Sequence, residues 1–202
     1  DLIGSGRTDA GVHSLGQVAN FKTNSNIPIE KLAIALNSQL KNSIVIKDAV
    51  EVDERFHSRY NAKQKTYRYI INNSKYGTAV YRNLEYCFPI KLDVEKMQKA
   101  AKYFEGEHDF KAFKSSGTSS KNSVRTIYKA EVRQDGERVI IELTGNGFLY
   151  NMVRIISGTL LDVGLSRINV EDIPKIIEEK DRSKAGKTLP AHGLYLVKVM
   201  YN

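Results

Sequence analysis

Hydrophobic positions in the first 62 residues predict three short elements. Residues 16–22 are typical of a short strand. Pro28 suits the start of a helix, where its missing N–H costs nothing. After it, apolar side chains recur at the spacing of one helix face: Ile29, Leu32, Ala33, Leu36 and Leu40. Residues 43–52 are rich in β-branched side chains and predict a second strand.

From residue 65 onward the pattern is more regular. Asp93 is a suitable N-cap for a helix with one apolar face: Val94, Met97, Ala101 and Phe104. Strand-like runs at 124–134 and 137–144 are separated by Asp135-Gly136, a strong hairpin signal because Gly tolerates positive φ. The other predicted elements are strands at 65–72 and 194–201, helices at 148–163 and 169–179, and a polar loop at 180–191.

The order of these elements suggests an internal repeat. From Lys65 the order is strand, helix, strand, strand, helix, strand, and residues 1–62 match it without a leading strand and helix. Each half resembles a split βαβ unit, as in ferredoxin-like and RNA-recognition (RRM-like) folds. We therefore predict an α+β fold of two pseudo-symmetric halves, 1–62 and 63–202, that share a continuous, mainly antiparallel sheet with a central cleft. The chain does not begin with Met, so we expect a fragment of a longer protein.

Composition narrows the class of protein. Of 202 residues, 41% are hydrophobic and 27% charged, a balance that excludes intrinsic disorder. A single cysteine, Cys87, excludes an internal disulfide framework and a multi-cysteine zinc site. No apolar run is long enough to span a membrane, and no signal peptide begins the chain. We expect a cytoplasmic protein that does not bind membranes.

Charge points to a polyanionic partner. Lys and Arg number 31 and Asp and Glu 23, for a net charge of +8. Basic and aromatic residues alternate at 55–60, continuing through Lys63, Lys65 and Arg68, and again at 102–114. Such stretches suit phosphate contacts and base stacking, or equally a solvated strand edge. Residues 115–122 predict a mobile loop that would suit an RNA-facing flap.

The densest motif is the glycine-rich segment 4–13, Gly-Ser-Gly-Arg-Thr-Asp-Ala-Gly-Val-His. It has neither the Lys of a Walker loop nor the third glycine of a dinucleotide fingerprint. In an extended loop Arg7 and Asp9 would point to the same side and could form an ion pair. Alternatively, Asp9 caps a turn by accepting backbone N–H groups.

Arg154 and Tyr67, outside this motif, each allow two interpretations. Arg154 lies inside the apolar run 148–163, where a charge is costly unless paired, or else its stem lies along apolar neighbours. Tyr67 lies on a predicted strand, where its ring either packs in the core or serves a site.

The histidines do not predict a metal site. Four are scattered along the chain, and none forms a His-x-x-x-His pair. The pairs Glu54/His57 and Glu105/His108 have a ligand-like spacing that chance explains.

Several motifs together resemble one family, tRNA pseudouridine synthase A. Residues 6–13 resemble its active-site motif, and residues 65–69 (Lys-Thr-Tyr-Arg-Tyr) resemble its second motif. Further matches follow in order: residues 106–113, then 147–154 (Gly-Phe-Leu-Tyr-Asn-Met-Val-Arg), then 188–201. The resemblance covers nearly the whole chain, and it departs at the front, where the family has a further strand and helix.

The resemblance implies a reaction in which a uridine of RNA is detached from its ribose at N1 and reattached through C5. It implies that Asp9 is the catalytic carboxylate, in an ionised form favoured by Arg7 or Arg154. It implies that Tyr67 stacks on the uracil. Attack on C1′, addition to the base and removal of a sugar proton all stay open for Asp9.

The resemblance also implies the partners. The substrate would be uridines at positions 38–40 of the tRNA anticodon stem–loop, the enzyme would be a homodimer, and no metal or organic cofactor would be needed. Among the basic residues, Arg59, Lys65 and Arg68 are expected to contact the RNA.

Two other functions fit the charge and the fold pattern. A non-catalytic RNA-binding module would not need Arg-Thr-Asp in a glycine-rich turn. A metabolic enzyme that uses the glycine loop as an anion nest would bind a small phosphate ligand and no RNA.

Overall fold

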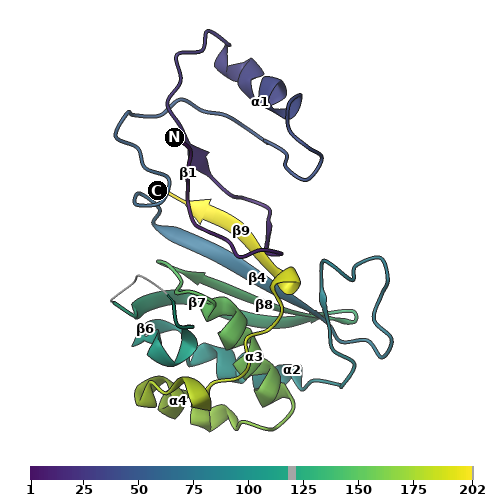
Figure 1. Cartoon of the computed structure of the whole chain (residues 1–202). Coiled ribbons are helices and arrows are strands. Elements are labelled where there is room, and N and C mark those ends of the chain that lie inside the picture. The colour runs from purple at the N-terminus through teal and green to yellow at the C-terminus, as the bar shows by residue number, and fades with distance from the viewer. Residues whose placement is uncertain (118–121, 202) are drawn as a thin grey trace. The chain divides into compact units, whose positions relative to one another are not determined.

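The computed structural model describes residues 1–117 and 122–201. The chain forms two compact units, one of residues 1–5 and 18–61 and one of residues 6–17 and 62–202 (Figure 1). Of the loop predicted at 115–122, residues 118–121 lie outside the described residues. The pseudo-symmetric halves 1–62 and 63–202 stay a prediction. In the structure the glycine-rich segment from Gly6 on belongs to the larger unit.

The smaller unit has one helix and one pair of strands. Strands β1 (Ile3–Gly4) and β3 (Ala19–Asn20) pair antiparallel, so the strand predicted at 16–22 is present but shorter. Helix α1 (Ile29–Asn37) follows Pro28, as the spacing predicts.

The strand predicted at 43–52 is wrong. These residues form no strand in the described structure, and Ile44, Val45 and Val50 are exposed. The side chain of Asn37 accepts from the N–H of Ile46 and donates to its carbonyl oxygen, both at 2.8 Å. Because both backbone groups of Ile46 are occupied in this way, they are not available to a neighbouring strand.

The described part of the larger unit contains a seven-stranded sheet in the order β2-β9-β4-β8-β7-β6, with β5 paired to β4. Its strands are β2 (His13–Ser14), β4 (Gln64–Asn72), β5 (Tyr86–Cys87), β6 (Gly106–Asp109), β7 (Val124–Asp135), β8 (Arg138–Gly145) and β9 (Leu194–Met200). All pairs are antiparallel except β2 with β9 and β4 with β5. The mainly antiparallel α+β class is therefore confirmed.

The predicted hairpin between β7 and β8 is confirmed, with its turn one residue later than expected. Asp135 pairs with Arg138, which leaves Gly136 and Glu137 as the turn residues. Gly136 has φ +57°, the backbone conformation that favours glycine at this position.

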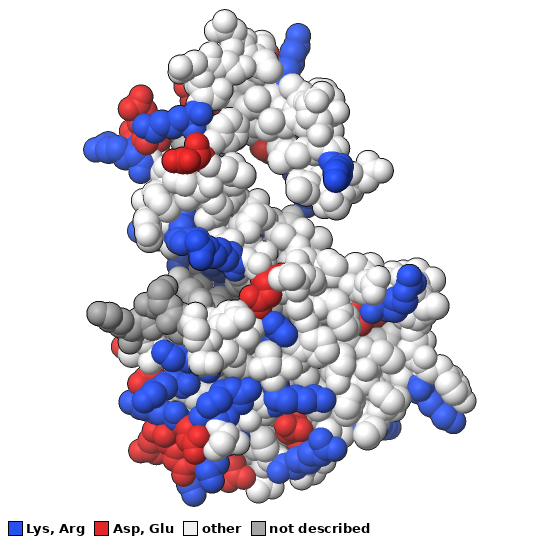
Figure 2. Space-filling view, in the orientation of Figure 1, with Lys and Arg blue, Asp and Glu red and all other residues white. Residues whose placement is uncertain are grey.

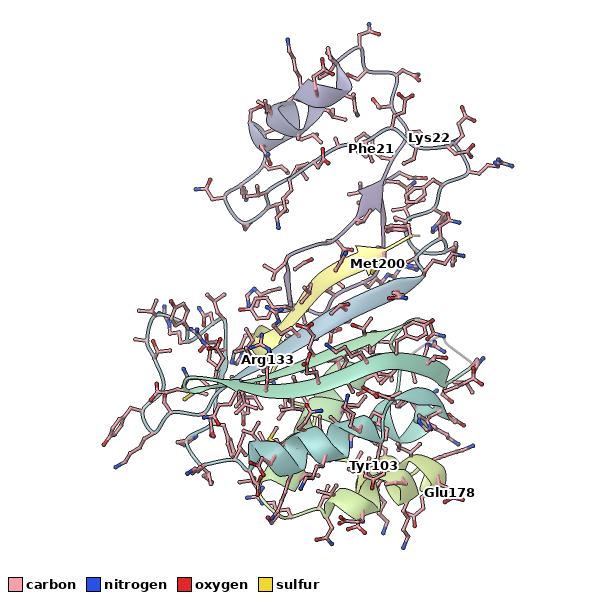
Figure 3. The ribbon with its side chains drawn as sticks, turned by 180° about the vertical axis from the view of Figure 1, so that it is seen from behind. Phe21, Lys22, Tyr103, Arg133, Glu178 and Met200 are labelled. Carbon is pink, nitrogen blue, oxygen red and sulfur yellow. The ribbon has the colours of Figure 1, made fainter. Side chains whose placement is uncertain are left out.

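Three helices cover one face of this sheet: α2 (Val94–Lys102), α3 (Met152–Gly164) and α4 (Ile173–Glu179) (Figures 1 and 3). Asp93 caps α2 as predicted, with its Oδ1 accepting from the N–H of Lys96 at 3.0 Å. Asn169 and Asp172 form a capping box before α4. Pro174 lies in the first turn of α4 and so interrupts no helical hydrogen bond.

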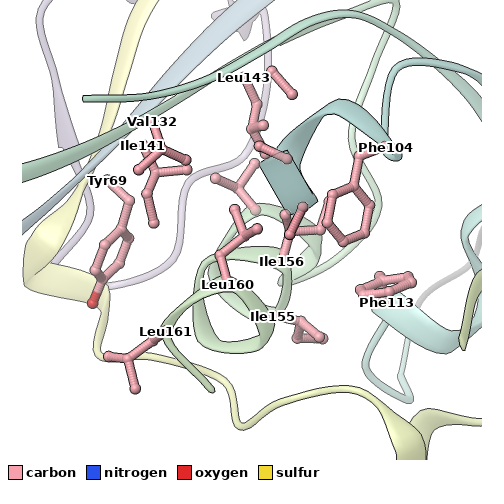
Figure 4. Packing of buried hydrophobic residues seen from close by; sticks show 14 of the residues in the cluster. Tyr69, Phe104, Phe113, Val132, Ile141, Leu143, Ile155, Ile156, Leu160 and Leu161 are labelled. Carbon is pink, nitrogen blue, oxygen red and sulfur yellow. The ribbon is translucent and has the colours of Figure 1, made fainter. Parts of the chain in front are cut away.

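Helix α3 is the centre of the core. Nearly all its side chains are buried, and Figure 4 shows Ile156 and Leu160 among residues from the sheet, such as Leu143, and from other elements, such as Phe104 and Phe113. The helix begins four residues later than the apolar pattern predicts. Asn151 has φ +62°, a left-handed conformation in which a helix cannot continue toward the N-terminus.

Candidate active site

The glycine-rich segment is attached to strand β9. His13 and Ser14 pair in parallel with Tyr195 and Leu196, and the N–H of Leu15 donates to Leu196 O at 2.8 Å. The next residue is Gly16, where a Cβ would stand 2.5 Å from Val197 O. Only glycine lets the backbone approach the strand this closely.

The turn before β2 presents Asp9. Gly11 has φ +83°, and the N–H of Val12 donates to the backbone oxygen of Asp9 at 3.0 Å. This backbone bond closes the turn, so the carboxylate is free for a partner elsewhere.

That partner is Arg154. Its Nη1 donates to Asp9 Oδ2 at 2.8 Å, across 145 positions of sequence. The arginine side chain is 16% exposed and that of Asp9 33%, so the ion pair is shielded while the carboxylate stays accessible. The expected pairing of these two residues is confirmed. Arg7, the other candidate, is exposed and has no ion-pair partner among residues 1–117 and 122–201.

Arg154 is held by two further acceptors. Its Nε donates to Leu189 O at 2.7 Å, and its Nη1 also donates to Asn151 Oδ1 at 2.7 Å. The N–H of Leu189 donates back to Arg154 O at 3.3 Å. The guanidinium is thus fixed on the side of Asp9 by groups from two different segments.

The segment that carries Leu189 lies directly against α3 because two glycines meet there. A Cβ on Gly158 would stand 1.9 Å from Lys187 O, and one on Gly186 would stand 2.5 Å from the backbone of Gly158. The N–H of Gly186 donates to Thr159 Oγ1 at 2.8 Å. Sequence reasoning missed this contact, although a glycine inside an apolar helix was a signal for close backbone approach.

Tyr67 lies on β4, and its ring and that of Phe148 form a T-shaped pair at a centroid distance of 5.2 Å. Burial, and secondarily the charge of Asp9, raises the pKa of Tyr67 to about 12. The phenol is therefore neutral at ordinary pH, and it lies close enough to Asp9 to sense its charge.

Of the basic residues expected to contact RNA, Lys65 and Arg68 lie on opposite faces of β4. Lys65 shares the face of Tyr67, and its Nζ lies 3.5 Å from where a Cβ on Gly6 would stand. Arg68 projects from the opposite face, because side chains alternate along a strand, and its Nε donates to Glu142 Oε2 at 2.9 Å. Arg59 is exposed in the smaller unit.

Two findings concern other kinds of site. Among the described residues, no three His, Cys, Asp or Glu side chains gather as ligands for a metal ion. None of the helices in the described ranges combines the length and apolar character needed to cross a membrane.

The site can supply an ionised carboxylate beside a fixed cation, together with an aromatic ring able to stack on a planar base. A carboxylate in this setting can act as nucleophile or base.

Two kinds of comparison with known proteins point to the same family. A family profile described as tRNA pseudouridine synthase matches residues 1–61 and 100–202. Proteins named tRNA pseudouridine synthase A are similar over the whole chain and 82% of their own length. That of Caldicellulosiruptor saccharolyticus is 57% identical, that of Acetivibrio thermocellus 56% and that of Clostridium acetobutylicum 50%.

Proposed function

Because this chain belongs to the tRNA pseudouridine synthase family, we infer that it is an isomerase that converts uridine to pseudouridine in tRNA. The observation that carries the inference is the ion pair of Asp9 with Arg154 beside Tyr67. All three residues lie in the segments that resemble the family's motifs.

The reaction is an isomerisation, so uridine and pseudouridine have the same composition. The C1′–N1 bond breaks, a C1′–C5 bond forms, the C5 proton leaves and N1 gains a proton, with no change in oxidation state. We assign the central step to Asp9. Attack on C1′, addition to the base and removal of a sugar proton all use its carboxylate, to which Arg154 Nη1 donates a hydrogen bond at 2.8 Å.

Tyr67 keeps the detached uracil in place. Its ring packs against Phe148 in a T-shaped arrangement, with the two ring planes at 78°, which restrains the orientation of the phenol. Its phenol is neutral and acts as a hydrogen-bond donor or acceptor, not as a charged base.

We propose that the substrates are uridines 38–40 of the tRNA anticodon stem–loop. We also propose that the protein is a cytoplasmic homodimer that binds one tRNA across both subunits. The excess of Lys and Arg supports a phosphate-binding surface. Figure 2 shows these side chains spread over the face of the larger unit that is in view, with a group of acidic side chains at one edge and a few others elsewhere.

Release of the C5 hydrogen tests the proposed function. The purified chain is incubated with tRNA transcripts labelled with tritium at uridine C5, and pseudouridine is then mapped in the product. We expect tritium release and pseudouridine in the anticodon stem–loop. Bound tRNA without any tritium release would exclude the synthase activity and favour an RNA-binding module.

Binding to tRNA is expected to depend steeply on salt. If the excess of +8 mostly serves phosphate contacts, log affinity falls linearly with log salt, because each neutralised phosphate releases a counterion. Fluorescence anisotropy with labelled tRNA over a salt series measures the slope. An affinity that does not change with salt would exclude the basic surface as the main RNA contact.

Tyr67 is expected to stay protonated where ordinary tyrosines ionise. Its pKa of about 12, compared with 10.0 for a free side chain, means that the phenolate forms only in strong alkali. The ultraviolet titration of the wild type and of Tyr67→Phe should therefore agree up to about pH 11. A difference between them that titrates near pH 10 would show that the ring is exposed and far from the Asp9 charge.

A further inference from the structure

Asn151 adopts a backbone conformation that glycine would adopt with less strain. Its φ is +62° and its ψ 5°, just before the first turn of α3. Within the described residues only Ser166 and Lys180 share a positive φ without being glycine. The left-handed conformation is unfavourable for a residue with a side chain, so its presence here suggests that the Asn151 side chain has a function.

The side chain does not cap the helix. It makes no hydrogen bond to the free N–H groups of the first turn of α3. Instead, Oδ1 accepts from Arg154 Nη1 at 2.7 Å and Nδ2 donates to Ser115 Oγ at 2.9 Å. Both ends of the amide are occupied, so its plane is fixed.

The contact with Asn151 affects the geometry of the ion pair between Arg154 and Asp9. Arg154 Nη1 carries two hydrogens, of which one goes to Asn151 and the other to Asp9. With Leu189 O on Nε, these acceptors define the plane of the guanidinium. Without Asn151 the guanidinium could turn about its Nε bond and lose alignment with the carboxylate.

We propose that Asn151 is a positioning residue for catalysis, which aims Arg154 at Asp9 and is itself oriented by Ser115. This rests on the proposed function of Asp9 and Arg154. Its contribution is to the chemical step, since misplacement of a catalytic group by about 1 Å can cost about 10²-fold in rate.

Asn151→Gly separates this role from a structural one. Glycine adopts a positive φ without strain. If Asn151 had only a structural role, the variant would therefore be at least as stable as the wild type and equally active. We expect a melting temperature no lower than the wild type, a KM for tRNA within about twofold, and a kcat reduced about 10- to 100-fold.

Ser166→Gly is the matched control. Ser166 has φ +56° past the other end of α3, and its exposed hydroxyl accepts from Lys96 Nζ at 3.0 Å. The same relief of backbone strain, with loss of a polar contact remote from Asp9, should leave kcat within about twofold of the wild type. A kcat for Asn151→Gly as high as that of Ser166→Gly would overturn the proposal.

Ser115→Ala provides a second measurement that does not alter the backbone strain at Asn151. It removes the acceptor of Asn151 Nδ2 and leaves Oδ1 in place, so we expect a smaller fall in kcat, about three- to tenfold, at unchanged KM. An unaltered kcat would exclude the role of Ser115 in orienting the Asn151 amide.

If the wild type formed no pseudouridine at all, the proposed function would fail. An active wild type with a fully active Asn151→Gly overturns only the role of Asn151.

Discussion

We expect replacement of Asp9 with Asn to abolish pseudouridine formation while tRNA binding persists. The amide keeps the size of the carboxylate and can still accept from Arg154, but it has no charge with which to attack carbon or remove a proton. We expect kcat to fall by about 10³-fold or more, as for the loss of a catalytic nucleophile. Tritium release at saturating tRNA gives kcat, and filter binding gives the dissociation constant for tRNA.

Asp162→Asn is the matched control for this change. Asp162 lies on α3 and forms an ion pair with Arg167 at 3.4 Å, so the same charge is removed from a pair at the far end of that helix. Its activity should equal that of the wild type. Turnover by purified Asp9→Asn at a rate near that of Asp162→Asn would exclude Asp9 as the catalytic carboxylate.

Arg154→Met is expected to reduce kcat by about 10²- to 10³-fold with a modest loss of stability. The carboxylate of Asp9 loses its cation, and its position in the turn is no longer restrained from α3. Methionine is flexible enough to fill the space of the arginine stem. Leu189 O loses its donor, which costs about 1–3 kcal/mol in the free energy of unfolding.

Thermal or denaturant unfolding and single-turnover kinetics measure the two effects separately. Arg167→Met serves as control, since Arg167 is an exposed arginine of the same region whose partner is Asp162. If Arg154→Met keeps the kcat of the Arg167→Met control, Arg154 does not support the chemistry. A loss of activity that only follows the unfolded fraction would lead to the same conclusion.

The two residues at the centre of the site were noticed in the sequence, but local patterns left their roles open. Arg154 inside an apolar run could be a paired charge or could lay its stem along apolar neighbours, and Asp9 could pair with Arg7 or cap a turn. The resemblance to the family named Arg154 as a possible partner of Asp9. Their pairing is confirmed at 2.8 Å. The residues that orient the arginine were not found, because Leu189 contributes a backbone oxygen and Asn151 an ordinary polar side chain.

Local patterns by themselves determined the hairpin of β7 and β8, the cap of α2 and the amphipathic helix after Pro28, because each depends on neighbours in the sequence. Only the tertiary structure decided which face of the sheet becomes the site. Tyr67 and Arg68 are adjacent in the chain, yet only Tyr67 lies on the face near Asp9, while Arg68 pairs with Glu142 on the other. Because side chains alternate along a strand, the sequence predicts that Tyr67 and Arg68 point to opposite faces of the sheet. It does not predict which face the helices and the glycine-rich segment will cover. That choice depends on contacts between residues distant in sequence, such as those of Asp9 and Leu189 with Arg154, which local periodicity does not record.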